Sequence, residues 1–141
     1  MDINNAYVRD AILYYTIQQY FNCNDKKTSQ FIAQLDHFKY RSGLIHNIPY
    51  LSLQLHVSEK DFYHTYLRVK DSFKTLPEGV ILVKKGDEIY SKLLAIIPAA
   101  PPYLFLKGNV YLLNKKSVSV VGSRNASKEA MKKTETLVKA L

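Results

Sequence analysis

The stretch Val118-Ser-Val-Val-Gly-Ser-Arg-Asn-Ala-Ser127 predicts a strand, a sharp turn and the start of a helix. Its three valines favour an extended strand of the kind found in parallel sheets. Gly122 follows where the chain must turn, and Asn125 or Ser127 can cap the helix expected over residues 128–141. A strand, a glycine turn and a helix N-terminus are typical of the first corner of a Rossmann-like domain.

This predicted corner has the chemistry of an anion-binding site. Unpaired backbone N–H groups and the positive end of the helix dipole favour a phosphate at a helix N-terminus. Arg124 adds a planar guanidinium that can hold two phosphate oxygens, and Ser123 and Ser127 add hydroxyl donors. A lone glycine instead of G-x-G-x-x-G disfavours NAD, and no G-x-S-x-G elbow supports a serine hydrolase. A purely structural corner with an exposed arginine is the alternative.

The residues before this corner are predicted to alternate between strand and helix. Residues 80–83 and 103–106 are short apolar runs that indicate strands, and residues 110–113 form a further apolar run. Residues 88–96 predict a short helix, with Asp87 as its N-cap candidate. A strand-and-helix region is therefore expected from residue 79 onward.

Residues 1–78 are predicted to form an all-α unit of three or four helices. Residues 6–20 and about 26–40 have helical apolar spacing, and Ser58-Glu-Lys-Asp61 has the spacing of a capping box at the start of a further helix. Gly43 and Pro49 indicate a break between them. The many aromatic side chains here have helical spacing and little local net charge, which favours core packing over the stacking of nucleic-acid bases.

Composition and charge limit the class of protein. The chain has 141 residues, of which 47% are hydrophobic, and suits one domain or a small domain plus part of another. The net charge is +8, and residues 79–141 carry +7 of it, with eleven basic and four acidic side chains. This favours nucleic acid as partner, then nucleotides, then a membrane surface, with a lysine-rich solvated surface as the alternative.

The remaining sequence features bear on disulfides, metal sites and the cellular compartment. Cys23 is the single cysteine, so an intrachain disulfide is excluded and a reducing cytoplasm is the expected compartment. The four histidines lack the i, i+4 spacing of a helical metal pair. No secretory signal is recognised, and no apolar stretch has the length of a transmembrane helix, so no membrane partner is expected.

Four linked elements in residues 79–141 resemble a known family. They are Gly79-Val-Ile-Leu-Val83, Tyr90 with Leu93-Leu94, Pro101-Pro102-Tyr-Leu-Phe105 with Lys107-Gly-Asn109, and Val118-Ser-Val-Val-Gly-Ser-Arg124 with Ser127. In order and spacing these elements resemble the DNA-processing protein A family, also called DprA or Smf. The resemblance implies single-stranded DNA binding in DNA uptake and natural transformation, with delivery of the strand to a RecA-type recombinase.

The resemblance also implies roles for individual residues. By analogy, Arg124 would hold a DNA phosphate, helped by Gly122, Ser123, Ser127 and Lys128. The family is not known for a catalytic reaction, so no catalytic residue, cofactor or metal is predicted.

The chain also departs from the family pattern. Ser91 stands where the family usually has proline. Because Leu141 falls inside or just after the first Rossmann helix, later strands and the surfaces for dimerisation and for the recombinase are expected to be missing. Exposed strand edges would allow the sheet to be completed by a second copy, which would give a homodimer.

The predicted fold class is α+β or α/β, with an N-terminal all-α bundle (residues 1–78) and the beginning of a Rossmann-like parallel-sheet domain (residues 79–141). The predicted function is that of a non-enzymatic single-stranded DNA-binding protein. One alternative is a phosphoribohydrolase-like Rossmann enzyme, which would use the same corner for a nucleoside monophosphate. Another is an adaptor that binds a partner protein through its helices.

Overall fold

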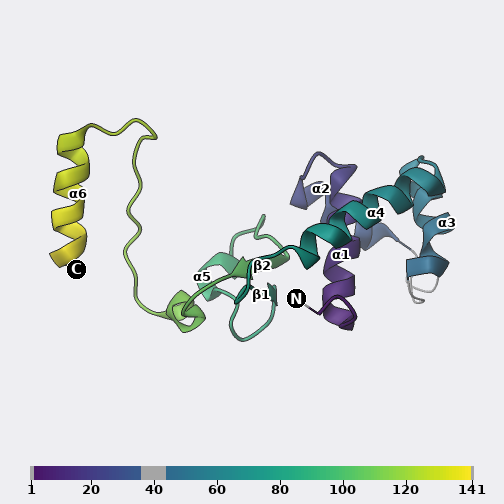
Figure 1. The fold of residues 1–141 in the computed structure, drawn as a ribbon, viewed down its shortest axis with the longest axis horizontal. Coiled ribbons are helices and arrows are strands. Elements are labelled where there is room, and N and C mark those ends of the chain that lie inside the picture. Colours follow the sequence, from purple (N-terminus) through teal and green to yellow (C-terminus); the bar gives the residue numbers. More distant parts are fainter. Residues whose placement is uncertain (1, 36–43, 141) are drawn as a thin grey trace.

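A computed structural model describes residues 2–35 and 44–140 (Figure 1). The first part of the chain is helical, with α1 (Ala6–Gln19), α2 (Asp25–Gln34), α3 (Leu44–Leu55) and α4 (Glu59–Lys74). The second part contains β1 (Ile81–Lys84), α5 (Lys92–Ala95), β2 (Tyr103–Leu106), the 3-10 helix η1 (Val110–Asn114) and α6 (Lys128–Ala140). The predicted order of a helical part followed by a part with strands is confirmed.

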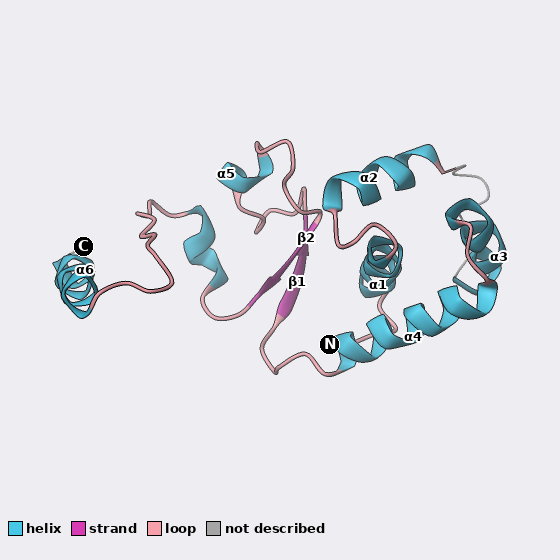
Figure 2. Cartoon of the chain, turned by 90° about the horizontal axis from the view of Figure 1, so that it is seen from above, coloured by secondary structure: helices cyan, strands magenta, loops and turns pink. Residues whose placement is uncertain are grey.

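Helix α1 is the centre of the helical part, with α2, α3 and α4 around it (Figure 2). Its Ile12 and Ile17 are fully buried, and Leu51 of α3 and Phe62 of α4 are buried to the same degree. Most of the aromatic side chains here pack in or against two apolar clusters, which confirms that they serve the core. Burial of this apolar surface is the main force that stabilises the helices.

Polar side chains cap the starts of three of these helices. The side chains of Asn5 and Asn24 accept hydrogen bonds from backbone N–H groups in the first turns of α1 and α2. Ser58 Oγ accepts from the Asp61 N–H at 3.0 Å, so the helix start predicted at Ser58 is confirmed. The Asp61 carboxylate accepts from the Ser58 hydroxyl at 2.6 Å, whereas in a full capping box it would accept from the Ser58 backbone N–H. Residues 36–40 of the second predicted helix lie outside the described residues.

Helix α3 corrects the break predicted at Pro49. The proline lies inside the helix, where it removes one i to i−4 hydrogen bond. Leu51 is fully buried and Ile48 and Leu55 pack against the same apolar cluster. Burial of this apolar face offsets the lost hydrogen bond, which local propensity alone does not anticipate.

The two strands form an antiparallel hairpin, with Ile81 opposite Leu106 and Lys84 opposite Tyr103. Both strands were predicted, but the described residues contain this two-stranded sheet and no parallel pair. The helix predicted over residues 88–96 is only α5, and its cap is Ser91 rather than Asp87. Asp87 instead folds back to accept a hydrogen bond from the Lys84 N–H at 2.7 Å.

Aromatic rings join the hairpin to the helices. Tyr103 of β2 is buried and its ring contacts the rings of Tyr7, Tyr14 and Tyr15 of α1, with centroids 5.5 to 6.2 Å apart. Phe105, two residues along the same strand, contacts Tyr15 and Phe73. These contacts extend the core of the helical part into residues 79–106.

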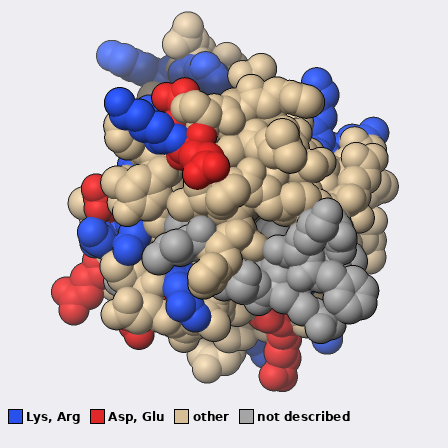
Figure 3. Space-filling view, turned by 90° about the vertical axis from the view of Figure 1, so that its right-hand side faces the viewer, with Lys and Arg blue, Asp and Glu red and all other residues tan. Residues whose placement is uncertain are grey.

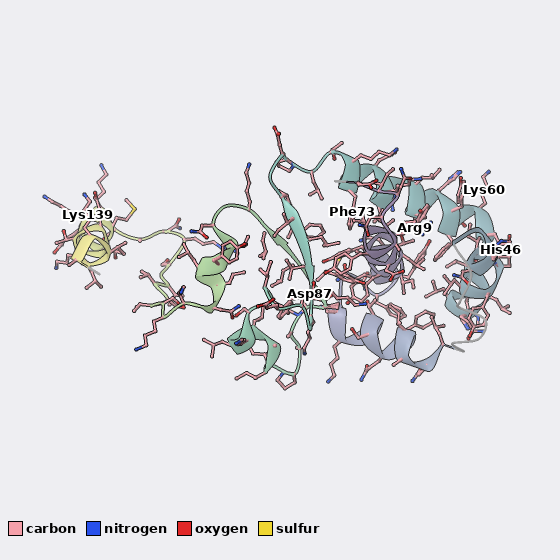
Figure 4. All side chains as sticks on the ribbon, turned by 90° about the horizontal axis from the view of Figure 1, so that it is seen from below. Arg9, His46, Lys60, Phe73, Asp87 and Lys139 are labelled. Atoms are coloured by element: carbon pink, nitrogen blue, oxygen red, sulfur yellow. The ribbon has the colours of Figure 1, made fainter. Side chains whose placement is uncertain are left out.

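A hydrogen bond from Tyr7 to Asp87 closes the edge of this junction, where Figure 4 labels Asp87 between the hairpin and α1. Tyr7 Oη donates to Asp87 Oδ2 at 2.5 Å. This bond, and then the one from the Lys84 N–H, lowers the pKa of Asp87 below its usual 3.8, while burial and then Asp87 raise the pKa of Tyr7. Both shifts keep a neutral donor facing an ionised acceptor at neutral pH.

We expect Tyr7→Phe to lower the free energy of unfolding by less than about 1 kcal/mol at pH 7, because Asp87 is exposed. The lowered pKa of Asp87 stabilises the fold above its unfolded value of 3.8, and this contribution is lost as the pH falls through the folded value. The variant should therefore lose less stability on acidification than the parent chain. Urea unfolding at pH 7 and pH 3 measures this, with Tyr63→Phe at an exposed position of α4 as control. An equal acid loss in all three proteins would contradict the assignment.

Candidate functional site

Helix η1 supports the segment that leads to the predicted corner. Asn114 Oδ1 accepts a hydrogen bond from the Lys92 N–H at 3.0 Å, which attaches the end of η1 to the start of α5. Tyr90 is buried beside it, and its hydroxyl donates to the Pro101 carbonyl at 2.6 Å. The chain that leaves η1 therefore starts from a fixed point on the hairpin unit.

The expected strand at Val118–Val121 is absent. These residues are exposed coil within an extended segment between η1 and α6, which stands apart from the other elements in Figures 1 and 2. A strand needs hydrogen bonds from a neighbouring strand, and in the described part of the chain none lies beside it. The prediction of an extended segment ahead of a helix is right, and the prediction of a paired strand is wrong for this structure.

The predicted site residues before the helix form a short exposed turn. Ser123 Oγ accepts a hydrogen bond from the Asn125 N–H at 3.2 Å, which makes a local side-chain turn around Arg124. Gly122 has open space around the position of a Cβ atom and is not among the glycines with positive φ. Neither a close contact nor backbone strain therefore requires a glycine here, and the space beside it is open to solvent.

Ser127 caps the start of α6, as the sequence predicted. Its Oγ accepts from the Ala130 N–H at 3.1 Å and its carbonyl accepts from the Met131 N–H at 3.0 Å. The backbone N–H groups of Lys128 and Glu129 belong to the first turn, where a helix supplies no partner of its own. The turn at Arg124 and these amide groups are thus separated by only three residues of chain.

The charges around this corner favour an anion. Arg124 and Lys128 are exposed, and Arg124 takes no part in the ion pairs found among the described residues. Glu129 is the one acidic residue in the first turn of α6, and Lys133 pairs with it at 2.7 Å. On the helical end of the molecule, basic and acidic side chains are interspersed (Figure 3). The excess of positive charge therefore belongs to the second part of the chain.

The structure brings together contacts that the sequence analysis did not predict. Tyr7 and Asp87 are 80 residues apart in sequence, and Tyr14 donates to Asp25 Oδ1 at 2.7 Å across the α1–α2 connection. No spacing rule in the sequence indicates such pairs. Among the described residues, no group of three or more His, Cys, Asp or Glu side chains is placed to hold a metal ion.

The second part of the chain is similar to known proteins. Residues 81–141 match the sequence model of a family described as DNA recombination-mediator protein A. The DNA processing protein DprA of Streptococcus pneumoniae (strain ATCC BAA-255 / R6) is 36% identical over 85 residues, which cover 57% of this chain and 29% of the relative. No solved structure matches the chain.

The second part of the chain, residues 81–141, is therefore similar to DNA recombination mediators. The match to the DNA recombination-mediator protein A model and the similarity to a DprA protein confirm the resemblance seen in the sequence motifs. The chain spans less than a third of the length of the pneumococcal relative. None of the described helices has both the length and the apolar character needed to cross a membrane.

Proposed function

We propose that this chain binds single-stranded DNA without catalysing a reaction on it, as part of a DprA/Smf-type protein that acts in natural transformation. The observation that carries the proposal is the exposed, unpaired Arg124 three residues before the capped N-terminus of α6. A guanidinium and first-turn amide groups are both suited to phosphate oxygens. The match of residues 81–141 to the recombination-mediator family supports DNA as the source of those phosphates.

The proposed contact set is Gly122, Ser123, Arg124, Ser127 and Lys128. The Ser127 hydroxyl already accepts a bond as helix cap, which leaves its proton as a donor to phosphate. Ser123 has the same arrangement through its bond from the Asn125 N–H. Because all these donors address phosphate rather than base edges, the binding should have little sequence preference.

We propose that Val118–Val121 and α6 are the beginning of a Rossmann-like domain. Val118–Val121 would become the first strand of a Rossmann-like parallel sheet once neighbouring strands pair with it, and α6 would cover that sheet with its apolar side. The exposed Val121, Met131 and Leu137 support this reading, since each leaves apolar surface in water. The pairing strands would come from further chain or from a second copy, which would give a homodimer.

We propose that the chain consists of two domains with different roles, which meet between residues 78 and 79. Residues 1–78 would be a helical N-terminal domain that supports the hairpin, and residues 79–141 would carry the DNA contacts. We further propose that the bound strand is delivered to a RecA-type recombinase in the cytoplasm, and the description of the matched family as a DNA recombination mediator supports a recombinase as partner.

A salt titration tests the proposal. We expect the 141-residue chain to raise the fluorescence anisotropy of a labelled single-stranded oligonucleotide. The logarithm of the binding constant should fall linearly with the logarithm of the salt concentration, with a slope of about −0.7 for each phosphate contacted. Oligonucleotides of different base composition should bind nearly alike. An affinity that does not change with salt, or the absence of binding at low salt, would contradict the proposal.

A further inference from the structure

Tyr111 is the most exposed aromatic side chain among the described residues. Its exposed fraction is 75%, against 43% for Tyr63 and 40% for Phe105. Most aromatic side chains in this chain serve the two apolar clusters, as described above. The Tyr111 ring is therefore free of the core and open to contact with another molecule.

The other apolar residues of η1 line a groove, and Tyr111 lies outside it. Val110, Leu112 and Leu113 line an open groove of about 600 Å³ together with residues of β2 and α5, and Tyr111 is not part of its lining. Asn114 fixes η1 against the start of α5. A segment that filled the groove would therefore cover the leucines, while Tyr111 lies outside it on an anchored helix.

The charge around Tyr111 is of one sign. Residues 89–128 contain no aspartate or glutamate, and they hold Lys92, Lys107, Lys115, Lys116, Arg124 and Lys128. Lys107 and Lys115 each stand four residues from Tyr111, and both are exposed, as is Lys116. An exposed aromatic ring between unopposed cations is the arrangement that single-stranded nucleic acid requires, with rings for bases and cations for phosphates.

We infer that Tyr111 stacks on a base of single-stranded nucleic acid, while Lys107, Lys115 and Lys116 contact its phosphates. The inference rests on the proposed function and extends it, because the strand held at Arg124 would continue along the acid-free segment to η1. Stacking accepts any base, so this contact adds affinity without sequence preference.

A tryptophan at position 111 tests the inference directly, because the chain contains no other tryptophan. In Tyr111→Trp, we expect emission typical of an indole in water, and quenching when oligothymidine is added. An abasic oligonucleotide of the same length should bind by its phosphates and quench far less. Tyr63→Trp, at an exposed position on α4, is the matched control and should not respond to either strand.

Affinity gives a second measurement. Tyr111→Ala should weaken binding of labelled oligothymidine by roughly 10-fold with an unchanged salt slope, and Tyr111→Phe should retain the parent affinity. Binding by anisotropy without tryptophan quenching, or an unaffected Tyr111→Ala, would overturn the role of Tyr111 and leave the proposed function standing. Absence of any binding by the parent chain would overturn both.

Discussion

Arg124→Ala is expected to weaken the binding of a single-stranded oligonucleotide by about 10- to 100-fold, which corresponds to a hydrogen-bonded ion pair with phosphate. The salt slope should also fall by about 0.7, the contribution of one phosphate contact on a single strand. Since Arg124 is exposed and precedes α6, its removal should leave the free energy of unfolding unchanged. Fluorescence anisotropy over a range of salt concentrations measures both effects.

Two further variants separate the guanidinium from general charge. Arg68→Ala removes an exposed arginine from α4, in the helical part, and should leave affinity and slope as they are. Arg124→Lys keeps the charge but loses the planar fork, so it should preserve most of the slope and recover only part of the affinity. Equal affinities for Arg124→Ala and the parent chain would remove Arg124 from the site.

The helices follow from local sequence where local physics decides them. Ser58 and Asp61 cap α4, and Glu129 and Glu135 pair with lysines four residues later on α6, at 2.7 and 2.6 Å. Each of these features depends on residues within one helical turn, which the sequence displays directly. Pro49 marks the limit of this reasoning, because burial of Leu51 maintains α3 around a residue that local rules interpret as a break.

Pairing between distant segments could not be derived in the same way. The antiparallel register of β1 and β2 depends on which strands find each other, and the sequence shows only that two apolar runs exist. Asp87 was expected to cap a helix, but Tyr7 and the Lys84 N–H occupy its carboxylate. For Val118–Val121 the extended conformation was predicted correctly, whereas a paired strand depends on neighbours that the described residues lack.

The sequence predicted which residues form the candidate site, but not how the chain is arranged around them. Ser127 caps α6 and Arg124 is exposed shortly before it, as a helix N-terminus after a turn requires. Gly122 was expected to be needed for a sharp turn, and its surroundings show no such need. No binding role was predicted for Tyr111, because the apolar run over residues 110–113 indicates a buried segment. Its exposed fraction of 75%, against 36% for Leu113, distinguishes it from its neighbours in the structure.

Tyr103→Ala is expected to lower the free energy of unfolding by about 3–5 kcal/mol, the usual cost of removing a buried aromatic side chain. The Tyr103 ring is buried against three tyrosines of α1, so its loss leaves a cavity between the helices and the hairpin. Urea unfolding followed by circular dichroism measures this cost. Tyr103→Phe keeps the ring and should lose much less, which gives a folded comparison if the alanine variant does not fold.

Tyr111→Ala is the matched control for that experiment, since it makes the same chemical change at a side chain that is 75% exposed. It should leave the free energy of unfolding within about 0.5 kcal/mol of the parent value. The two alanine variants thus separate a role in the folded core from a role in DNA binding. Tyr103→Ala is expected to change stability, and Tyr111→Ala is expected to change DNA affinity. A Tyr103→Ala protein that unfolds like the parent would mean that the helices and the hairpin do not share a core, and residues 1–78 would then fold without help from the segment that carries the site.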